Sequence, residues 1–333
     1  MNFLKLYYLG KPSDGYGWGV ANTNLVKSLG EFCEVVVDNS NQTRFDSPVF
    51  VPVVDNSLNP IRSVSAPRTV GYCFTEWPLT DKAERTARQY DVLFAGSTWN
   101  TAKLLNAGIK QADTLIQGVD LDRFKPQSPS ARNGFVVFSG GKYEFRKGQD
   151  YVIAAMRHFM KWHGDAVLIT AWHNPWPQSA LSMKNSWLVN HESPMEGLPM
   201  DRVIQLPAMT NDKMAGIYGM AHIGVFPNRC EAGTNMVMAE FMACARPVIA
   251  SYAHGQADIL DNSQYLLKSG SYDPAGWFNT NVSDILNHLE KAYTDRADAV
   301  MRGNFNGKNM ARFTWRDAAL KIARAAFPGR DFQ

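Results

Sequence analysis

Short apolar runs alternate with helical patterns along most of this chain, and the alternation stops once and then restarts. Before the interruption, the apolar runs predict six β-strands, over Phe3–Leu9, Glu34–Asp38, Val49–Val54, Thr69–Phe74, Val92–Ala95 and Thr114–Ile116. Helical patterns lie between some of these strands, over Gly19–Leu29, Asp81–Tyr90 and Thr98–Ala107. Strands that alternate with helices predict an α/β fold with a doubly wound parallel sheet.

The interruption is the polar segment Lys125–Asn133, whose proline and serine content predicts a linker. After it, new strands are predicted over Phe135–Ser139, Ala166–Ala171, Val203–Leu206, Ile223–Phe226 and Val248–Ala250, with helices over Gln149–Trp162 and Asp212–Ala221. We therefore expect two doubly wound domains, over residues 1–128 and 129–310, and a C-terminal helix within residues 311–333 that packs near their junction.

Net charge, the length of apolar runs and the spacing of cysteines limit the classes of protein to which this chain can belong. The net charge of +3 is too small to indicate nucleic-acid binding by itself, although it does not exclude it. No apolar run approaches the length of a membrane span, and the N-terminus lacks a signal-peptide pattern. The 4 cysteines are scattered without metal-type spacing, so we expect a cytoplasmic protein.

The segment from Glu231 to Glu240 carries the clearest chemical signal. A buried strand, Ile223–Phe226, leads into a loop of small residues, and a helix is predicted from Met236 to Cys244. A loop that ends at a helix N-terminus offers backbone amides to an anion such as a phosphate. The spacing of the two acids would put them on opposite faces of one helix, so Glu231 is expected in the loop and Glu240 on the helix.

The helix itself is expected to begin at a polar cap. Thr234 or Asn235 would supply the N-cap, and Gly233 lies in the loop before them. The backbone amides from Thr234 to Val237, including that of Met236, would then face the anion.

A second charged loop, Ser139–Gly148, follows the first strand after the linker. Gly140 and Gly141 allow a tight turn there. Lys142, Arg146 and Lys147 supply three cations that suit a diphosphate, because a departing diphosphate carries charge that must be neutralised. A solvated basic turn would explain these residues equally well when they are taken alone.

The N-terminal half offers weaker candidates for an acceptor site. Gly17 and Gly19 belong to a glycine-rich stretch after the first strand, which a plain tight turn also explains. Glu76, just past the strand Thr69–Phe74, could orient or deprotonate an acceptor hydroxyl, and a structural role is an equal alternative. All 7 histidines follow the linker, so this half has no histidine for such a role.

Together these motifs resemble the retaining GT-B glycosyltransferases of the family-4 type. The loop Ser139–Gly148 is similar to that family's diphosphate loop, with Lys142 and Lys147 at its two cationic positions. Glu231 and Glu240 resemble its glutamate pair, in a subgroup form that reads Glu-Ala-Gly-Thr-Asn. Gly118–Phe124 resembles the signature that precedes the interdomain linker.

Two departures from the family pattern stand out. Lysine at position 142 replaces the usual arginine, which keeps the charge and loses the bidentate fork. The two glutamates are separated by one residue more than is usual, and we place the extra residue at Gly233 or Thr234.

Asp120 and Asp122 look superficially like a metal-binding pair, but they belong to the linker signature and are expected to be structural.

The resemblance implies a fold, a reaction and a role for each residue. It implies two Rossmann-like domains facing across a cleft, and transfer of a sugar from a UDP- or GDP-sugar with retention, without metal or other cofactor. Lys142 and Lys147 would hold the diphosphate, Glu231 the donor sugar and Glu240 the ribose. Further donor contacts are implied for Gly141, Arg146, Gly233, Thr234, Asn235, Met236 and Val237.

The acceptor is open, and we expect a saccharide or another hydroxyl compound. Three rival functions fit the same features. A nucleotide-sugar epimerase or hydrolase would share the architecture, a non-catalytic protein could bind the nucleotide-sugar, and a glycosyltransferase could act on a modified nucleic-acid base. The presence of both acids and both lysines favours an enzyme over the non-catalytic protein.

Overall fold

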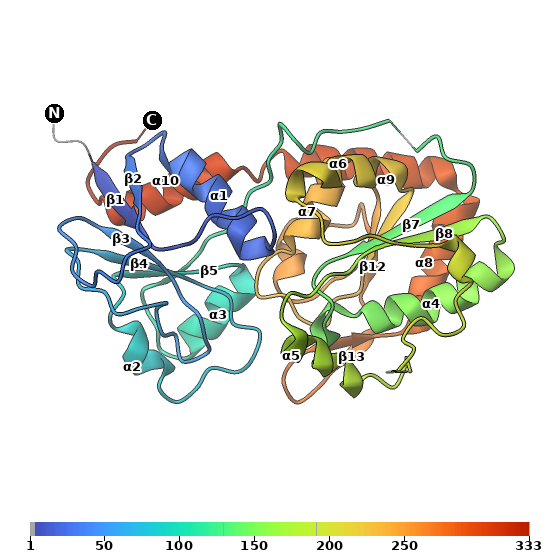
Figure 1. Cartoon of the computed structure of the whole chain (residues 1–333), viewed down its shortest axis with the longest axis horizontal. Helices are drawn as coiled ribbons and strands as arrows, with labels where there is room; N and C mark the ends of the chain where they lie inside the picture. Colours follow the sequence, from blue (N-terminus) through green and yellow to red (C-terminus); the bar gives the residue numbers. More distant parts are fainter. Residues whose placement is uncertain (1–3, 129, 191, 333) are drawn as a thin grey trace. The chain divides into compact units, whose positions relative to one another are not determined.

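The computed structural model describes residues 4–128, 130–190 and 192–332 of the chain. These residues form two compact units. The first unit contains the described residues up to Asp120, Ala232–Thr234 and those from Phe313 onward. The second contains Leu121–Glu231 and Asn235–Arg312. Each unit is built on its own parallel sheet (Figure 1).

The first sheet has six strands in the order β2-β1-β3-β4-β5-β6, and all its neighbouring strands are parallel. Its strands are β1 (Lys5–Tyr8), β2 (Glu34–Val37), β3 (Val49–Pro52), β4 (Thr69–Cys73), β5 (Val92–Ala95) and β6 (Ala112–Thr114). The six predicted strands are confirmed, although the last lies earlier than predicted. Phe3, where the first was expected to begin, is outside the described residues.

Helices cover the two faces of this sheet, with α1 and α10 on one face and α2 and α3 on the other (Figure 1). They are α1 (Gly17–Leu29), α2 (Ala83–Ala87), α3 (Thr98–Asn106) and α10 (Trp315–Ala326). The prediction of a helix over Asp81–Tyr90 was too long. After Ala87 the backbone continues in tighter turns, and the amide of Tyr90 donates to the Ala87 carbonyl at 3.0 Å. The Tyr90 side chain is buried, and its hydroxyl donates to the Leu58 carbonyl at 2.9 Å.

The second sheet also has six parallel strands, in the order β12-β11-β10-β7-β8-β9. They are β7 (Phe135–Gly140), β8 (Ala166–Ala171), β9 (Val203–Gln205), β10 (Ile223–Phe226), β11 (Val248–Ser251) and β12 (Tyr265–Leu267). Every residue of β7, β10 and β11 is buried, as expected for parallel strands with helices on both faces.

The helices of the second unit are α4 (Gln149–Trp162), α5 (Pro177–Ala180), α6 (Asn211–Met220), α7 (Met236–Ala243), α8 (Val282–Thr294) and α9 (Arg296–Met310). They are accompanied by the 3₁₀ turns η1 (Phe145–Lys147), η2 (Leu181–Asn185), η3 (Met200–Arg202) and η4 (His254–Ile259). A small antiparallel pair, β13 (Gly270–Tyr272) and β14 (Phe278–Thr280), completes the unit. In the described part of the chain, no helix combines the length and apolarity that crossing a membrane requires.

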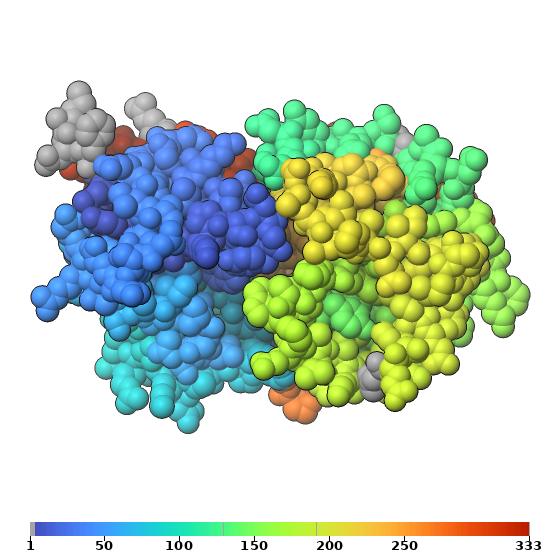
Figure 2. Space-filling model, viewed as in Figure 1, coloured from blue at the N-terminus to red at the C-terminus, as the bar shows by residue number. Residues whose placement is uncertain are grey.

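The segment after Asp120 runs over the surface of the second unit beside α6. The Gln127 amide donates to the Ala215 carbonyl and the Ser130 hydroxyl donates to the Met220 carbonyl, each at 2.8 Å. Figure 2 shows this green segment lying against the yellow residues of α6. The stretch that its composition marks as a linker is thus fixed to one unit by side-chain hydrogen bonds.

Strands β7 and β10 are neighbours in the second sheet. Because parallel strands end at the same edge, the loops that follow them must approach each other there. These loops hold the two charged motifs of the sequence, at residues 141–148 and 227–235.

Candidate functional site

Glycine at position 148 allows the two loops to touch. Its φ is +70°, and a Cβ there would lie 2.1 Å from the Pro227 carbonyl oxygen. Gly141, with φ +124°, turns the chain at the other end of the same loop. Between them, η1 holds Arg146 and Lys147 on one short turn.

Backbone hydrogen bonds then fix one loop against the other. The amides of Arg229 and Cys230 donate to the Arg146 carbonyl, at 2.7 and 3.3 Å. In return, the Arg146 guanidinium donates to the Cys230 carbonyl at 3.3 Å. Arg146 therefore has its position set from the main chain and from the side chain.

Glu231 lies at the centre of a buried charge cluster. Its Oε1 accepts from Lys147 Nζ and from the Asn228 side-chain amide, and its Oε2 accepts from Arg146 Nη1 at 3.1 Å. Only 7% of the Glu231 side chain is exposed, so these partners replace water. The expectation that Glu231 lies in the loop before the helix is confirmed.

The charges in this cluster influence each other's protonation. Burial by itself raises the pKa of Glu231, but the attraction of Lys147 and Arg146 and the hydrogen bonds from Lys147 and Asn228 outweigh it, and the net pKa is below its ordinary value. Burial lowers the pKa of Lys147, and Glu231 opposes this only in part. The cluster thus keeps Glu231 ionised.

Glu144 extends the cluster and was not singled out from the sequence. Its carboxylate is 2.8 Å from Lys142 Nζ and 2.7 Å from Arg146 Nε, and the residue is buried. Lys142 also lies 5.2 Å from the centre of the Trp176 ring. The result is a chain of alternating charges that runs from Lys142 through Glu144 and Arg146 to Glu231. The only feature of the sequence that could have indicated a role for Glu144 is its place between Lys142 and Lys147 in the same motif.

The fully buried ion pair between Arg229 and Asp150 lies next to this cluster and fixes the loops that carry it. Arg229 makes two hydrogen bonds to Asp150 on α4, at 2.7 and 2.8 Å, and donates to the Phe145 carbonyl at 2.7 Å. Its guanidinium also stacks between the rings of Phe145 and Tyr151, 3.7 and 4.2 Å from their centres. Arg229 therefore joins η1, α4 and the loop after β10 at one point. Sequence reasoning missed this pair as well.

The helix α7 begins beside the cluster. Asn235 has φ +64° and caps the helix by accepting from the Met238 amide at 3.4 Å. Of the two predicted caps, Asn235 is therefore the one used. A Cβ on Gly140 would approach the Val237 side chain to 2.9 Å, so the end of β7 lies directly under the first turn of α7. The loop residues Gly233 and Thr234 group with the first unit.

Glu240 projects from α7 toward α6. Its two carboxylate oxygens accept from the Asn211 side-chain amide at 2.8 Å and the Tyr218 hydroxyl at 2.9 Å. Burial, together with Glu240, raises the pKa of Tyr218 well above its ordinary value, so this hydroxyl acts as a hydrogen-bond donor. Both partners come from α6 and hold the carboxylate in one orientation.

The weaker candidates all lie in the first unit. Gly17 and Gly19 belong to the first turn of α1, and a Cβ on Gly19 would meet Ser13 at 2.5 Å. Close packing thus explains the glycine at position 19, whereas Gly17 has open space around it. Glu76 is half-buried in the loop that follows β4. The described residues contain no group of three or more histidine, cysteine or acidic side chains placed to hold a metal ion.

Comparison with known proteins relates this architecture to glycosyltransferases. Residues 134–287 match the family model described as "Glycosyl transferases group 1". The matched residues make up most of the second unit. A curated D-inositol 3-phosphate glycosyltransferase from Xylanimonas cellulosilytica is 25% identical over 235 residues, which are 66% of this chain and 52% of that protein. The chain thus spans about half the length of the curated relatives it matches.

Solved structures share the fold across nearly the whole chain. Sucrose-phosphate synthase from Thermosynechococcus elongatus has a TM-score of 0.68 at 16% identity, covering 96% of this chain and 98% of the other. The Anabaena protein Alr3699/HepE, solved in complex with UDP-glucose, has a TM-score of 0.69 at 14% identity, with 96% and 98% covered. The fold class is therefore GT-B, as the sequence motifs predicted.

Proposed function

We propose that this protein transfers a sugar from a nucleoside-diphosphate sugar to a hydroxyl acceptor, with retention of anomeric configuration and without a metal ion. The family model that matches residues 134–287 supports the reaction class. The donor class is supported by the Anabaena protein of the same fold, whose structure contains UDP-glucose. We assign the reaction to the cytoplasm, where the four free cysteines would stay reduced.

The observation that carries the proposal is the cluster of Arg146, Lys147 and Glu231 at the carboxyl edge of the second sheet. A diphosphate leaving group develops negative charge as the glycosidic bond breaks. Buried cations in a water-poor site stabilise that charge strongly, because their orientation is already fixed. A site with several cations can therefore promote departure of the diphosphate without a metal.

Lys142, Gly141 and the first turn of α7 extend this anion site in the proposal. The amides of Met236 and Val237 lie at the helix N-terminus, where the helix dipole favours the distal phosphate. Gly141 lets the backbone of its loop approach the phosphates closely.

The two glutamates would bind the uncharged parts of the donor. Glu231, held ionised by Lys147 and Arg146, is a strong acceptor for sugar hydroxyls. Glu240 would accept from the ribose hydroxyls, with Asn211 and Tyr218 fixing the direction of its lone pairs. Gly17, Gly19 and Glu76 of the first unit remain our candidates for the acceptor side.

Donor turnover with and without acceptors is the direct test. We expect release of nucleoside diphosphate from a UDP- or GDP-sugar to rise at least about tenfold when a suitable acceptor is added. The acceptor panel would include simple saccharides and D-inositol 3-phosphate, the compound named for the curated relative. Full turnover without any acceptor would instead indicate an epimerase or hydrolase.

The substitution Glu231→Gln tests the site itself. It keeps the side-chain shape and removes the charge, so we expect transfer to fall by about 10²-fold or more while the far-ultraviolet circular dichroism stays unchanged. Glu84→Gln, which removes an exposed carboxylate paired with Arg88 on α2, is the matched control and should leave transfer unchanged. Activity equal to that of the wild type in Glu231→Gln would remove this residue from the mechanism.

A further inference from the structure

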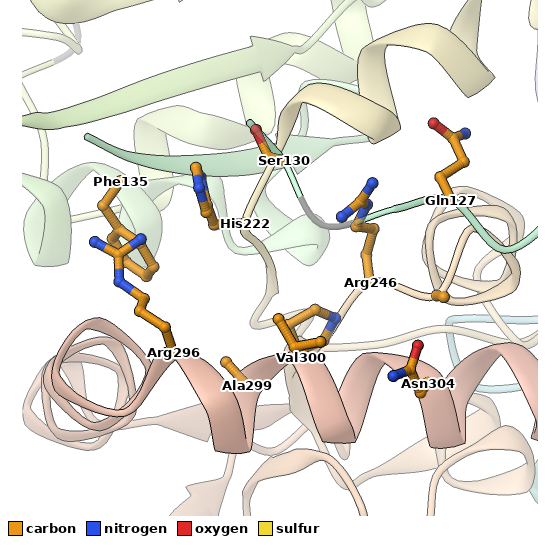
Figure 3. Close-up of a pocket in the computed structure, with 11 residues that line it drawn as sticks. Gln127, Ser130, Phe135, His222, Arg246, Arg296, Ala299, Val300 and Asn304 are labelled. Atoms are coloured by element: carbon orange, nitrogen blue, oxygen red, sulfur yellow. The ribbon is translucent and has the colours of Figure 1, made fainter. Parts of the chain in front are cut away.

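A pocket with a volume of about 260 Å³ lies in the second unit. Its lining comes from the segment before β7, the start of β7, the turns before β10 and β11, and helix α9. The lining residues are Gln127, Ser130, Phe135, His222, Ala245, Arg246, Pro247, Arg296, Ala299, Val300 and Asn304. Figure 3 shows Arg296 and Asn304 rising from α9, with His222 and Arg246 on the opposite side of the space.

This pocket is separate from the charge cluster around Glu231. Phe135 is the first residue of β7, His222 directly precedes β10, and Pro247 directly precedes β11. The pocket therefore lies at the amino edge of the sheet, whereas the cluster lies at the carboxyl edge. A ligand bound in one cannot touch the residues of the other, because the strands separate them.

Arg246 contributes a buried cation whose hydrogen-bond partners, within the described residues, are neutral carbonyls. The residue is 3% exposed, and its Nη2 donates to the carbonyls of Ser128 and Gly219 at 2.6 and 3.2 Å. Its Nε is buried and has no hydrogen-bond partner among the described residues. Burial lowers the pKa of Arg246, which reflects the cost of holding this charge away from water. An unsatisfied buried donor on a cation is a position that an anion would stabilise.

Arg296 supplies the second cation, from the first turn of α9. Its guanidinium stacks over the rings of Phe135 and Tyr293, 4.3 and 4.9 Å from their centres. Its hydrogen bonds go to the carbonyls of Tyr293 and Gly134, at 2.9 and 3.4 Å. The negative charge of Asp165 raises the pKa of Arg296, in opposition to burial, which lowers it. Asp165 accepts from the Tyr293 hydroxyl at 2.9 Å and is not among the residues that line the pocket.

His222 adds a neutral donor between the two arginines. Its Nδ1 accepts from the Val136 amide at 3.0 Å, so the proton of the neutral ring is on Nε2. Burial and the nearby charges of Arg296 and Arg246 lower the pKa of His222 to about 4, which keeps the ring neutral at physiological pH. None of the lining residues carries a carboxylate.

We propose that this pocket is a binding site for a small oxyanion with phosphate chemistry, either inorganic phosphate or the phosphate group of a small ester. Two guanidinium groups and a ring N–H donor match the several acceptor oxygens of a phosphate. The volume lies just below the range of pockets for drug-sized ligands, so the ligand is small. Its binding would tie α9 to the segment that carries Gln127 and Ser130.

Thermal unfolding with added phosphate tests this site. We expect inorganic phosphate or methyl phosphate to raise the unfolding midpoint of the wild type above that in chloride at equal ionic strength, since ligand binding stabilises the folded state. Arg296→Gln should weaken the apparent phosphate affinity about tenfold or more, because it removes one charged donor group. If inorganic phosphate binds more tightly than methyl phosphate, the ligand is the free ion, and the reverse order indicates a phosphate ester.

Two further variants locate the effect. Lys308→Gln, an exposed position on the same helix outside the pocket lining, should keep the full phosphate response. Lys147→Gln, in the Glu231 cluster, should also keep it. The proposal is overturned if phosphate gives no stabilisation beyond chloride, if Arg296→Gln responds like the wild type, or if Lys147→Gln alone loses the response. Arg246 is left unchanged in these tests, because its guanidinium also holds the carbonyls of Ser128 and Gly219 in place.

Discussion

At Gly148 the backbone conformation and the neighbouring chain together exclude any side chain. We expect Gly148→Ala to lower the free energy of unfolding by at least about 2 kcal/mol, since the left-handed φ of +70° is strained for alanine and the new Cβ would meet the Pro227 carbonyl. Gly164→Ala is the matched control, because a Cβ there has open space and the φ is ordinary. Urea unfolding of both variants measures the difference, and equal stability of the two would contradict it.

The charge of Glu231 predicts a pH dependence of stability. Its pKa in the folded protein is below its ordinary value of 4.5, so near that pH the unfolded chain binds more protons than the folded one. The stability that ionised Glu231 contributes is therefore complete above about pH 5.5 and is lost as the pH falls through and below 4.5. The difference in unfolding free energy between the wild type and Glu231→Gln should shrink over this window.

Urea titrations at several pH values between 3.5 and 7 would measure that difference. The control is Glu84→Gln, whose carboxylate is 56% exposed and pairs with Arg88 on the surface. A gap between the wild type and Glu231→Gln that stays constant across the window would show that the Glu231 carboxylate is not held by its cations.

Single residues of the cluster differ in how far the sequence could reveal them. Lys142, Lys147 and Glu231 were predicted because charge next to glycine or a helix start is a pattern that one sequence displays. Asp150 and Arg229 were not, because their pairing depends on α4 crossing under the loop after β10, which no local pattern encodes. An acid in the first turn of a helix otherwise has an ordinary explanation in the helix dipole.

At the scale of elements, the Arg229–Asp150 pair joins η1, α4 and the loop after β10. We expect Arg229→Met and Asp150→Asn each to cost about 3–5 kcal/mol, since each leaves a buried group without its partner. The double variant should cost clearly less than the sum, because it removes both charges at once. A double-mutant cycle by urea unfolding gives this coupling.

The ion pair between Arg302 and Asp298 provides a reference cycle. It joins two residues of α9 one turn apart at 2.7 Å, and its side chains are 19% and 16% exposed. Its coupling should be on the order of 0.5 kcal/mol, as for pairs within one helix. Couplings of similar size in the two cycles would mean that the Arg229–Asp150 pair does not hold the loops together.

Several elements were predicted with the ends that the structure has, whereas others were missed, among them α8 in spite of its amphipathic pattern. Strands β5, β8 and β10 and helix α4 have the predicted ends. Helix α9 was not predicted, because it contains Gly303, Gly307 and several asparagines, which favour helices poorly. Packing explains the glycine: a Cβ on Gly303 would lie 2.3 Å from the Ala245 carbonyl oxygen. Tertiary contact here outweighs local preference.

At the scale of the whole molecule, the chain builds its first unit from both ends. After Arg312 it groups again with the residues before Asp120, and α10 packs on α1 and β4. The backbone of Trp315 comes so close to Gly118 that a Cβ there would lie 2.1 Å from the Trp315 amide nitrogen. The amide of Val119 also donates to the Phe313 carbonyl at 2.9 Å. The first sheet therefore depends on the end of the sequence for the cover of one face.

This topology predicts that a destabilising substitution in α10 lowers the stability of the first unit only. Ile322 is fully buried, so Ile322→Ala should cost the first unit about 2–5 kcal/mol and speed amide exchange in α1 and β4. Exchange in β7 and β10 should stay as in the wild type, because those strands belong to the second unit. Arg324→Ala, at an exposed position of the same helix, should change neither pattern. Hydrogen exchange read by mass spectrometry separates the cases, and a loss of protection spread evenly over both sheets would mean that the two units unfold as one.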